Sequence, residues 1–125
     1  MDVQPPAIEL VEGQPIDPAR LRALVDGLFG DMVKLVIDVR RRVVAVGGEL
    51  HADAEALLLG AGSRQADLWG ANYYPGLGAD DCLQFTALIN IRPTQDNRAM
   101  EVQDPVIRRT MRELVDELVG RGEPL

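Results

Sequence analysis

Residue types that carry common functional chemistry are scarce in this chain of 125 residues, which contains one cysteine, one histidine and one tryptophan. The single cysteine, Cys82, cannot form a disulfide within the chain. One histidine and one cysteine are also too few for a zinc or iron centre built from nitrogen and sulfur ligands. These shortages exclude a disulfide-stapled fold and argue against a metal centre.

Long hydrophobic runs are missing as well, since no apolar stretch approaches the roughly 18 residues that a membrane-spanning helix needs. The first residues, Met-Asp-Val-Gln-Pro-Pro, contain neither the basic nor the hydrophobic segment of a secretory signal. Together with the single cysteine, these features predict a cytoplasmic protein that makes no membrane contact.

Positive charge is in deficit, because 13 basic residues face 20 acidic ones and leave a net charge of −7. A negative field repels phosphate backbones, so a nucleic-acid partner is not expected. The local exception is Arg40-Arg41-Arg42, which is interpreted either as an exposed turn or as a contact for a small anion. A chain of this length can fold as one domain without metal or disulfide support.

Two long helices are predicted from helix-start signals and apolar stripes. Asp17-Pro18 and Asp104-Pro105 each combine an N-cap acceptor with a proline at the first helical position. Apolar residues recur at helical spacing after both starts, and Gly30 and Gly120 mark the ends.

Alternating apolar residues predict strands, and the resulting fold class is α+β. We expect a four-stranded antiparallel sheet with the two long helices, and one short helix, packed on one face. Residues 1–16 are expected to form an extended arm with a short strand within Ala7–Val11, and residues 17–125 a single domain. The expected strands are Met32–Val39, Val43–Gly47, Leu68–Tyr74 and Leu83–Arg92, and the short helix is Ala52–Leu59.

Glu49, His51 and Asp53 are the candidate catalytic residues. If the strand that begins at Val43 continues through Gly48, Glu49 and His51 share the face that points away from the core, and Leu50 points into it. The same alternation places further polar residues on this open face, namely Asn72, Tyr74, Asn90 and Arg92. A carboxylate, an imidazole and an arginine on one surface suit acid–base chemistry or anion binding.

The segment from Arg92 to Arg98 adds hydrogen-bond donors for an anionic ligand. The predicted ligand-binding residues are Asn72, Asn90, Arg92, Gln95, Asn97 and Arg98. The alternative interpretation is a loop that is ordered by hydrogen bonds to its own backbone.

These residues are compatible with several functions. Glu49, His51 and Asp53 could hold a divalent cation, although no metal or other cofactor is predicted. His51 could also be purely structural. The chain is expected to be a ligand- or protein-binding module that forms a homo-oligomer through its sheet, because the open face carries apolar residues, namely Val36, Val43, Ala45 and Leu88. The alternatives are a small acid–base enzyme or hydrolase, with Arg92 or Arg98 holding an anionic substrate, and a regulatory partner of another protein.

The chain combines the motifs VGGELHADAE (46–55), GSRQ (62–65), LWGANYYP (68–75), INIRPTQDNR (89–98) and the Asp-Pro helix start. In combination these motifs resemble a family of small bacterial proteins that is known only as a domain of unknown function. The resemblance covers the chain from about Asp17 to Val119. It implies a single-domain bacterial protein and assigns no activity to any residue.

Overall fold

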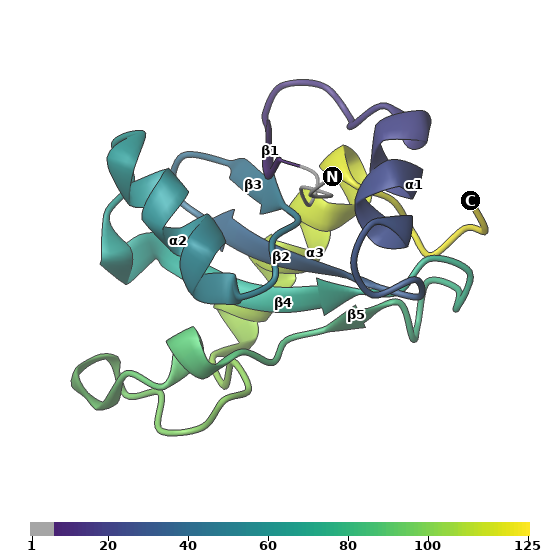
Figure 1. Ribbon diagram of the computed structural model, residues 1–125. Coiled ribbons are helices and arrows are strands. Elements are labelled where there is room, and N and C mark those ends of the chain that lie inside the picture. The colour runs from purple at the N-terminus through teal and green to yellow at the C-terminus, as the bar shows by residue number, and fades with distance from the viewer. Residues whose placement is uncertain (1–6) are drawn as a thin grey trace.

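The computed structural model describes residues 7–125, and its centre is an antiparallel five-stranded sheet with the strand order β1-β3-β2-β4-β5 (Figure 1). The α+β class and the antiparallel sheet are therefore confirmed. The strands are β1 (Glu9–Val11), β2 (Val33–Asp38), β3 (Val43–Val46), β4 (Leu68–Tyr73) and β5 (Leu83–Gln84).

The expected strand count of four was one too low, because the short strand anticipated within Ala7–Val11 pairs with β3 and joins the sheet as β1. Glu9 lies opposite Val46, and Val11 lies opposite Val44. Residues 1–6 of the expected arm lie outside the described residues.

The two long helices begin where the Asp-Pro pairs predict. The carboxylate of Asp17 accepts a hydrogen bond from Ala19 N (3.2 Å) at the start of α1 (Pro18–Asp26). Asp104 does the same for Val106 N (2.8 Å) at the start of α3 (Pro105–Leu118). In residues 7–125, no helix is both long enough and apolar enough to cross a membrane.

The short helix α2 (His51–Gly60) packs on the opposite face of the sheet from α1 and α3, which corrects the expectation that all helices share one face (Figure 1). The physical reason is that β2 and β3 are apolar on both sides. Val36 and Ala45 lie opposite each other in register, and both are fully buried beneath Ala54 and Leu58 of α2. A sheet that is apolar on both faces needs a layer on each side.

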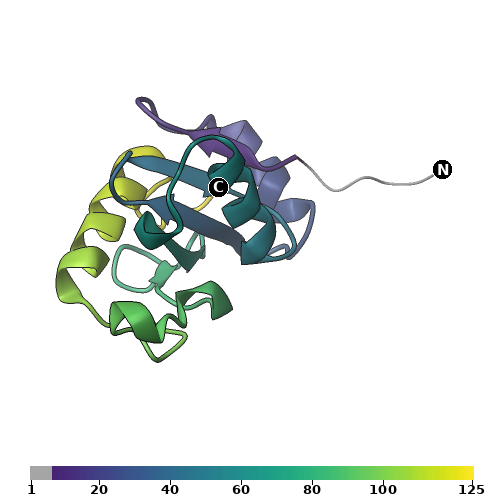
Figure 2. The same ribbon diagram turned by 90° about the vertical axis from the view of Figure 1, so that its left-hand side faces the viewer.

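The expected strand Leu83–Arg92 is wrong beyond its first two residues. After β5 the chain leaves the sheet and forms two short 3₁₀ turns, Leu88–Asn90 and Pro93–Gln95, beside the sheet and before α3 (Figure 2). Residues 85–87 pair with residues 100–102 instead of β4, since Val102 N donates to Phe85 O (2.9 Å) and Ala87 N to Met100 O (3.1 Å).

The strand β3 ends at Val46 and does not continue to His51. Gly47 and Gly48 take φ values of +113° and +96°, a region that favours glycine and breaks the extended conformation. The chain then turns, so His51 becomes the first residue of α2 and Leu50 is 58% exposed rather than directed into the core.

Candidate functional site

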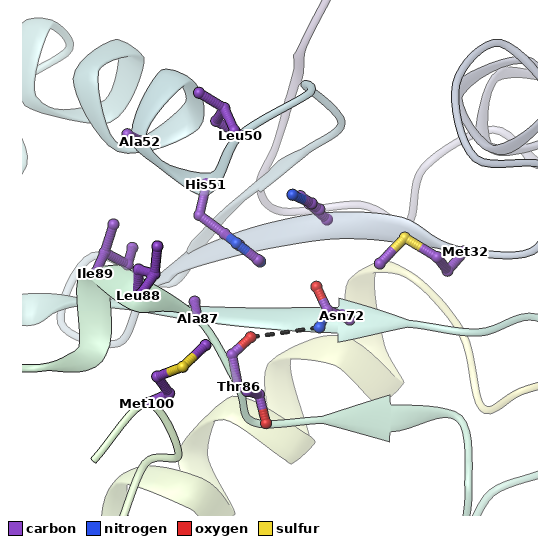
Figure 3. Close-up of a pocket in the computed structure, with 11 residues that line it drawn as sticks. Met32, Leu50, His51, Ala52, Asn72, Thr86, Ala87, Leu88, Ile89 and Met100 are labelled. Carbon is purple, nitrogen blue, oxygen red and sulfur yellow. Dashed lines mark hydrogen bonds between the residues drawn. The ribbon is translucent and has the colours of Figure 1, made fainter.

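A pocket of about 380 Å³ lies between the first turn of α2, the strands β2 and β4, and the segment that follows β5 (Figure 3). A volume of this size accommodates a small organic molecule. Its walls are mainly apolar, and three groups (Lys34, His51 and Asn72) provide most of its polar character. The lining residues are Met32, Lys34, Leu50, His51, Ala52, Asn72, Thr86, Ala87, Leu88, Ile89 and Met100.

The His51 ring reaches from the start of α2 toward β4, where Nε2 lies 2.8 Å from the carbonyl oxygen of Ala71 (Figure 3). A carbonyl oxygen only accepts hydrogen bonds, so Nε2 carries the proton and Nδ1 of the neutral ring is an acceptor. Burial lowers the pKa of His51, and the positive charge of Lys34 lowers it further, against the opposing effect of the hydrogen bond that the ring donates to the carbonyl oxygen of Ala71. His51 is therefore neutral at physiological pH.

The Asn72 side chain lies in the same pocket and has unused hydrogen-bonding capacity. Its Nδ2 donates to the carbonyl oxygen of Thr86 (3.3 Å) (Figure 3). This bond fixes the orientation of the amide, because the flipped amide would place Oδ1 against the Thr86 oxygen and both atoms are acceptors. Its Oδ1 is buried and has no hydrogen-bond partner among residues 7–125. A buried acceptor without a donor is costly unless a bound molecule or water supplies one.

Apolar side chains around the pocket remain unusually accessible. Leu88 is 70% exposed, Leu50 58% and Met100 42%. These three residues come from different segments of the chain and meet only at the pocket. An apolar rim around a few polar groups is typical of a small-molecule site.

Asn90, by contrast, lies outside this pocket and is fully buried in a hydrogen-bond network. Its Oδ1 accepts from Gly70 N (2.8 Å), and its Nδ2 donates to the carbonyl oxygens of Gly70 (3.0 Å) and Met100 (3.0 Å). The carboxamide thus pairs with both backbone groups of Gly70, as a neighbouring strand would. Gly70 permits this approach, since a Cβ there would lie 2.5 Å from Ala87 Cβ.

The Arg92 guanidinium is likewise engaged by the protein itself. It stacks on the ring of Trp69 with 3.9 Å between Cζ and the ring centroid, and it donates to the carbonyl oxygens of Gln65 and Leu68. Gln95 Oε1 accepts a further bond from Arg92 (3.1 Å). This interaction set anchors the second 3₁₀ turn to β4.

Asn97 completes the internal network of this loop. Its side chain donates to Asn90 O (2.8 Å) and accepts from Gln103 N (2.9 Å). Arg98 is exposed, and only its backbone N–H makes a hydrogen bond, to Gln103 Oε1 (3.4 Å). The geometry of the loop matches the alternative in which it is ordered by its own backbone.

Glu49 and Asp53 are exposed and do not line the pocket that holds His51. Within residues 7–125, neither carboxylate makes a hydrogen bond or ion pair with the imidazole. No group of three or more metal-binding side chains occurs in this part of the chain. Of the nine residues predicted as catalytic or ligand-binding, the structure brings only His51 and Asn72 together in the pocket.

Sequence reasoning missed most of the pocket. Lys34 could have been found, because the alternation in β2 places it on the face away from α1 and α3, and it lies directly opposite Asn72 in the register. Met100 could not have been predicted as a lining residue, since it lies 28 positions beyond Asn72 in the sequence and no local pattern indicates that the two residues share a pocket.

Comparison with known proteins identifies a family and no function. The profile of the family described as "Protein of unknown function (DUF5674)" matches residues 10–118. No curated protein and no solved structure matches the chain.

Proposed function

The chain belongs to this family of unknown function, and from its site we propose that it is a binding module that holds a small, largely apolar ligand in the pocket beside α2. The observation that carries the proposal is Asn72 Oδ1, a buried acceptor that has no hydrogen-bond partner within residues 7–125 and belongs to a residue lining a mainly apolar pocket. A ligand that donates a hydrogen bond there would satisfy this atom and cover the exposed apolar rim.

Acid–base catalysis is a second candidate, supported by one observation. His51 is neutral with an available Nδ1, so it can accept a proton in the pocket. Its predicted catalytic partners, Glu49 and Asp53, lie outside the pocket, and Arg92 is bound to the backbone. Binding without turnover therefore has the stronger support.

Ligand-observed NMR with a library of small apolar fragments tests the proposal. The matched variants are Ala52→Trp and Ala56→Trp, which add the same bulk to exposed positions one turn apart on α2. Of these two alanines, only Ala52 lines the pocket. We expect fragments to bind the unchanged protein and Ala56→Trp equally, and to lose most binding to Ala52→Trp.

Fragments that bind both tryptophan variants as well as the unchanged protein would contradict this location for the site. Chemical conversion of a bound fragment, abolished by His51→Gln, would instead favour the catalytic candidate.

We also propose, as a separate property, that the protein is a cytoplasmic homo-oligomer. The apolar residues that suggested a sheet-to-sheet contact, Val36, Val43 and Ala45, are buried beneath α2. A contact would therefore use apolar side chains that stay exposed, such as Leu57 and Leu59 of α2, each 41% exposed. Sedimentation analysis that finds only monomer at high concentration would contradict the oligomer.

A further inference from the structure

We propose that the ligand of this pocket is an apolar carboxylic acid that carries an N–H or O–H donor next to its carboxylate. This chemistry occurs in an N-acyl hydrophobic amino acid and in the C-terminal residue of a peptide. The inference rests on the proposed binding function and adds the ligand class to it.

The charge of the lining points to an anion. The chain contains 20 acidic residues, yet within residues 7–125 none of the eleven residues that line the pocket is acidic, and one of them is the only lysine of the chain. In residues 7–125, Lys34 forms no ion pair, and its ammonium lies over the ring of Phe29, at 5.2 Å between Nζ and the ring centroid. A carboxylate in the pocket would complement a cation that has no opposite charge beside it.

The start of α2 adds to the same preference. Leu50, His51 and Ala52 bring the first turn of this ten-residue helix to the pocket. Leu50 occupies the N-cap position and provides no side-chain hydrogen bond to the first N–H groups. The partial positive charge of a helix start stabilises a nearby anion.

The position of Asn72 relative to Lys34 defines the second feature of the ligand. The two residues lie directly opposite each other on the adjacent strands β2 and β4. Side chains in such a pair have Cβ atoms about 4.5–5.5 Å apart, so one small group can contact both. A carboxylate at Lys34 and an adjacent N–H or O–H at Asn72 Oδ1 satisfy the cation and the unpartnered acceptor together.

The walls define the third feature, an apolar body. Met32, Leu50, Leu88, Ile89 and Met100 contribute apolar side chains around the polar pair. Two methionines among them give the pocket a shape that adapts to different side chains. An amino acid with a branched or aromatic side chain would bury that side chain against these walls.

N-acetyl-leucine is the probe, with its methyl ester and its N-methyl derivative as matched controls in isothermal titration calorimetry. The ester removes the negative charge, and N-methylation removes the donor. We expect N-acetyl-leucine to bind about tenfold more tightly than either control, since each control loses one charge-assisted or buried hydrogen bond.

Two variants connect each ligand group to its residue. In Lys34→Gln the preference for the acid over its ester should shrink to the part that the start of α2 contributes, and in Asn72→Ala the N-methyl derivative should bind as well as the parent. Arg109→Gln removes one positive charge from an exposed position of α3, outside the pocket, and should leave all affinities unchanged.

The outcomes separate the ligand class from the proposed function. Equal binding of the acid, ester and N-methyl forms, with all three lost in Ala52→Trp, overturns the ligand class and leaves the binding function standing. No binding of any form, together with a failed fragment test, overturns both. Acetyl-Ala-Ala-Leu distinguishes the sources, because tighter binding than N-acetyl-leucine supports a peptide end and equal binding supports a free acid.

Discussion

Two asparagines, Asn90 beside β4 and Asn72 within it, use their amides in opposite ways. Asn90 is fully buried, and both of its amide atoms are bonded to backbone groups. Asn72 is half-buried, makes one long hydrogen bond to Thr86, and keeps a buried oxygen that no group of residues 7–125 contacts by a hydrogen bond.

The same contrast extends to the surrounding regions. Around Asn90, the side chains of Arg92, Gln95 and Asn97 are hydrogen-bonded within the protein. Around Asn72, in the part of the chain that the structure describes, Lys34 forms no ion pair and His51 Nδ1 accepts no hydrogen bond, and both residues lie among apolar walls. A dense run of polar residues therefore marked a structural element, although Arg92 Nε in it is buried and has no partner within residues 7–125. The candidate site differs because its unpartnered acceptor belongs to a residue that lines a cavity.

The largest expected effect is on stability at Asn90. Asn90→Ala removes both hydrogen bonds to Gly70 and leaves the buried N–H and carbonyl groups of Gly70 without these partners. We expect the free energy of unfolding to fall by about 3–5 kcal/mol. Urea denaturation, monitored by the fluorescence of Trp69, measures this change. A decrease of less than about 1 kcal/mol in the free energy of unfolding would show that Asn90 does not hold this loop to β4.

Gly70→Ala should have the next largest effect. Its Cβ would lie 2.5 Å from Ala87 Cβ and 3.3 Å from His51 Cδ2, so the segment after β5 must move away from the strand. We expect a loss of about 1–3 kcal/mol in unfolding free energy. The matched control is Gly60→Ala in α2, where an added Cβ meets nothing within 4 Å, and its stability should be unchanged or slightly higher.

The pH dependence of stability reports on His51, the only histidine. Burial lowers its pKa in the folded protein, so the unfolded chain binds the proton more tightly. Stability should therefore decrease as the pH falls below about 6.5, by at most about 1.4 kcal/mol per pH unit, and level off below the folded pKa. The urea midpoint, measured between pH 7.5 and 5, should show this decrease in stability, and the decrease should be absent in His51→Gln.

The smallest expected effect is at Asn72, and it tests the comparison most directly. Asn72→Ala removes one 3.3 Å hydrogen bond and also the unpartnered oxygen, and these two changes oppose each other. The free energy of unfolding should change by less than about 1 kcal/mol. A loss as large as that of Asn90→Ala would mean that Asn72 is structural and that its oxygen has no ligand role.

Much of the fold followed from local patterns in the sequence. The Asp-Pro pairs at residues 17–18 and 104–105 fix two helix starts through bonds that span two residues. The alternation around Val33–Asp38 and Val43–Val46 predicted the central hairpin, because strand faces repeat every two residues. These features depend on neighbours in the chain, so the sequence alone determined them.

Only the tertiary structure decided where α2 packs, where β5 ends and which polar groups stay unused. The alternation from Leu83 to Arg92 continues past the end of β5, but the amide of Asn90 takes the place of a strand beside Gly70. The pocket is formed by side chains from β2, α2, β4 and the turns near Leu88 and Met100. Contacts between such distant segments depend on the packing of the whole chain, which no short stretch of sequence encodes.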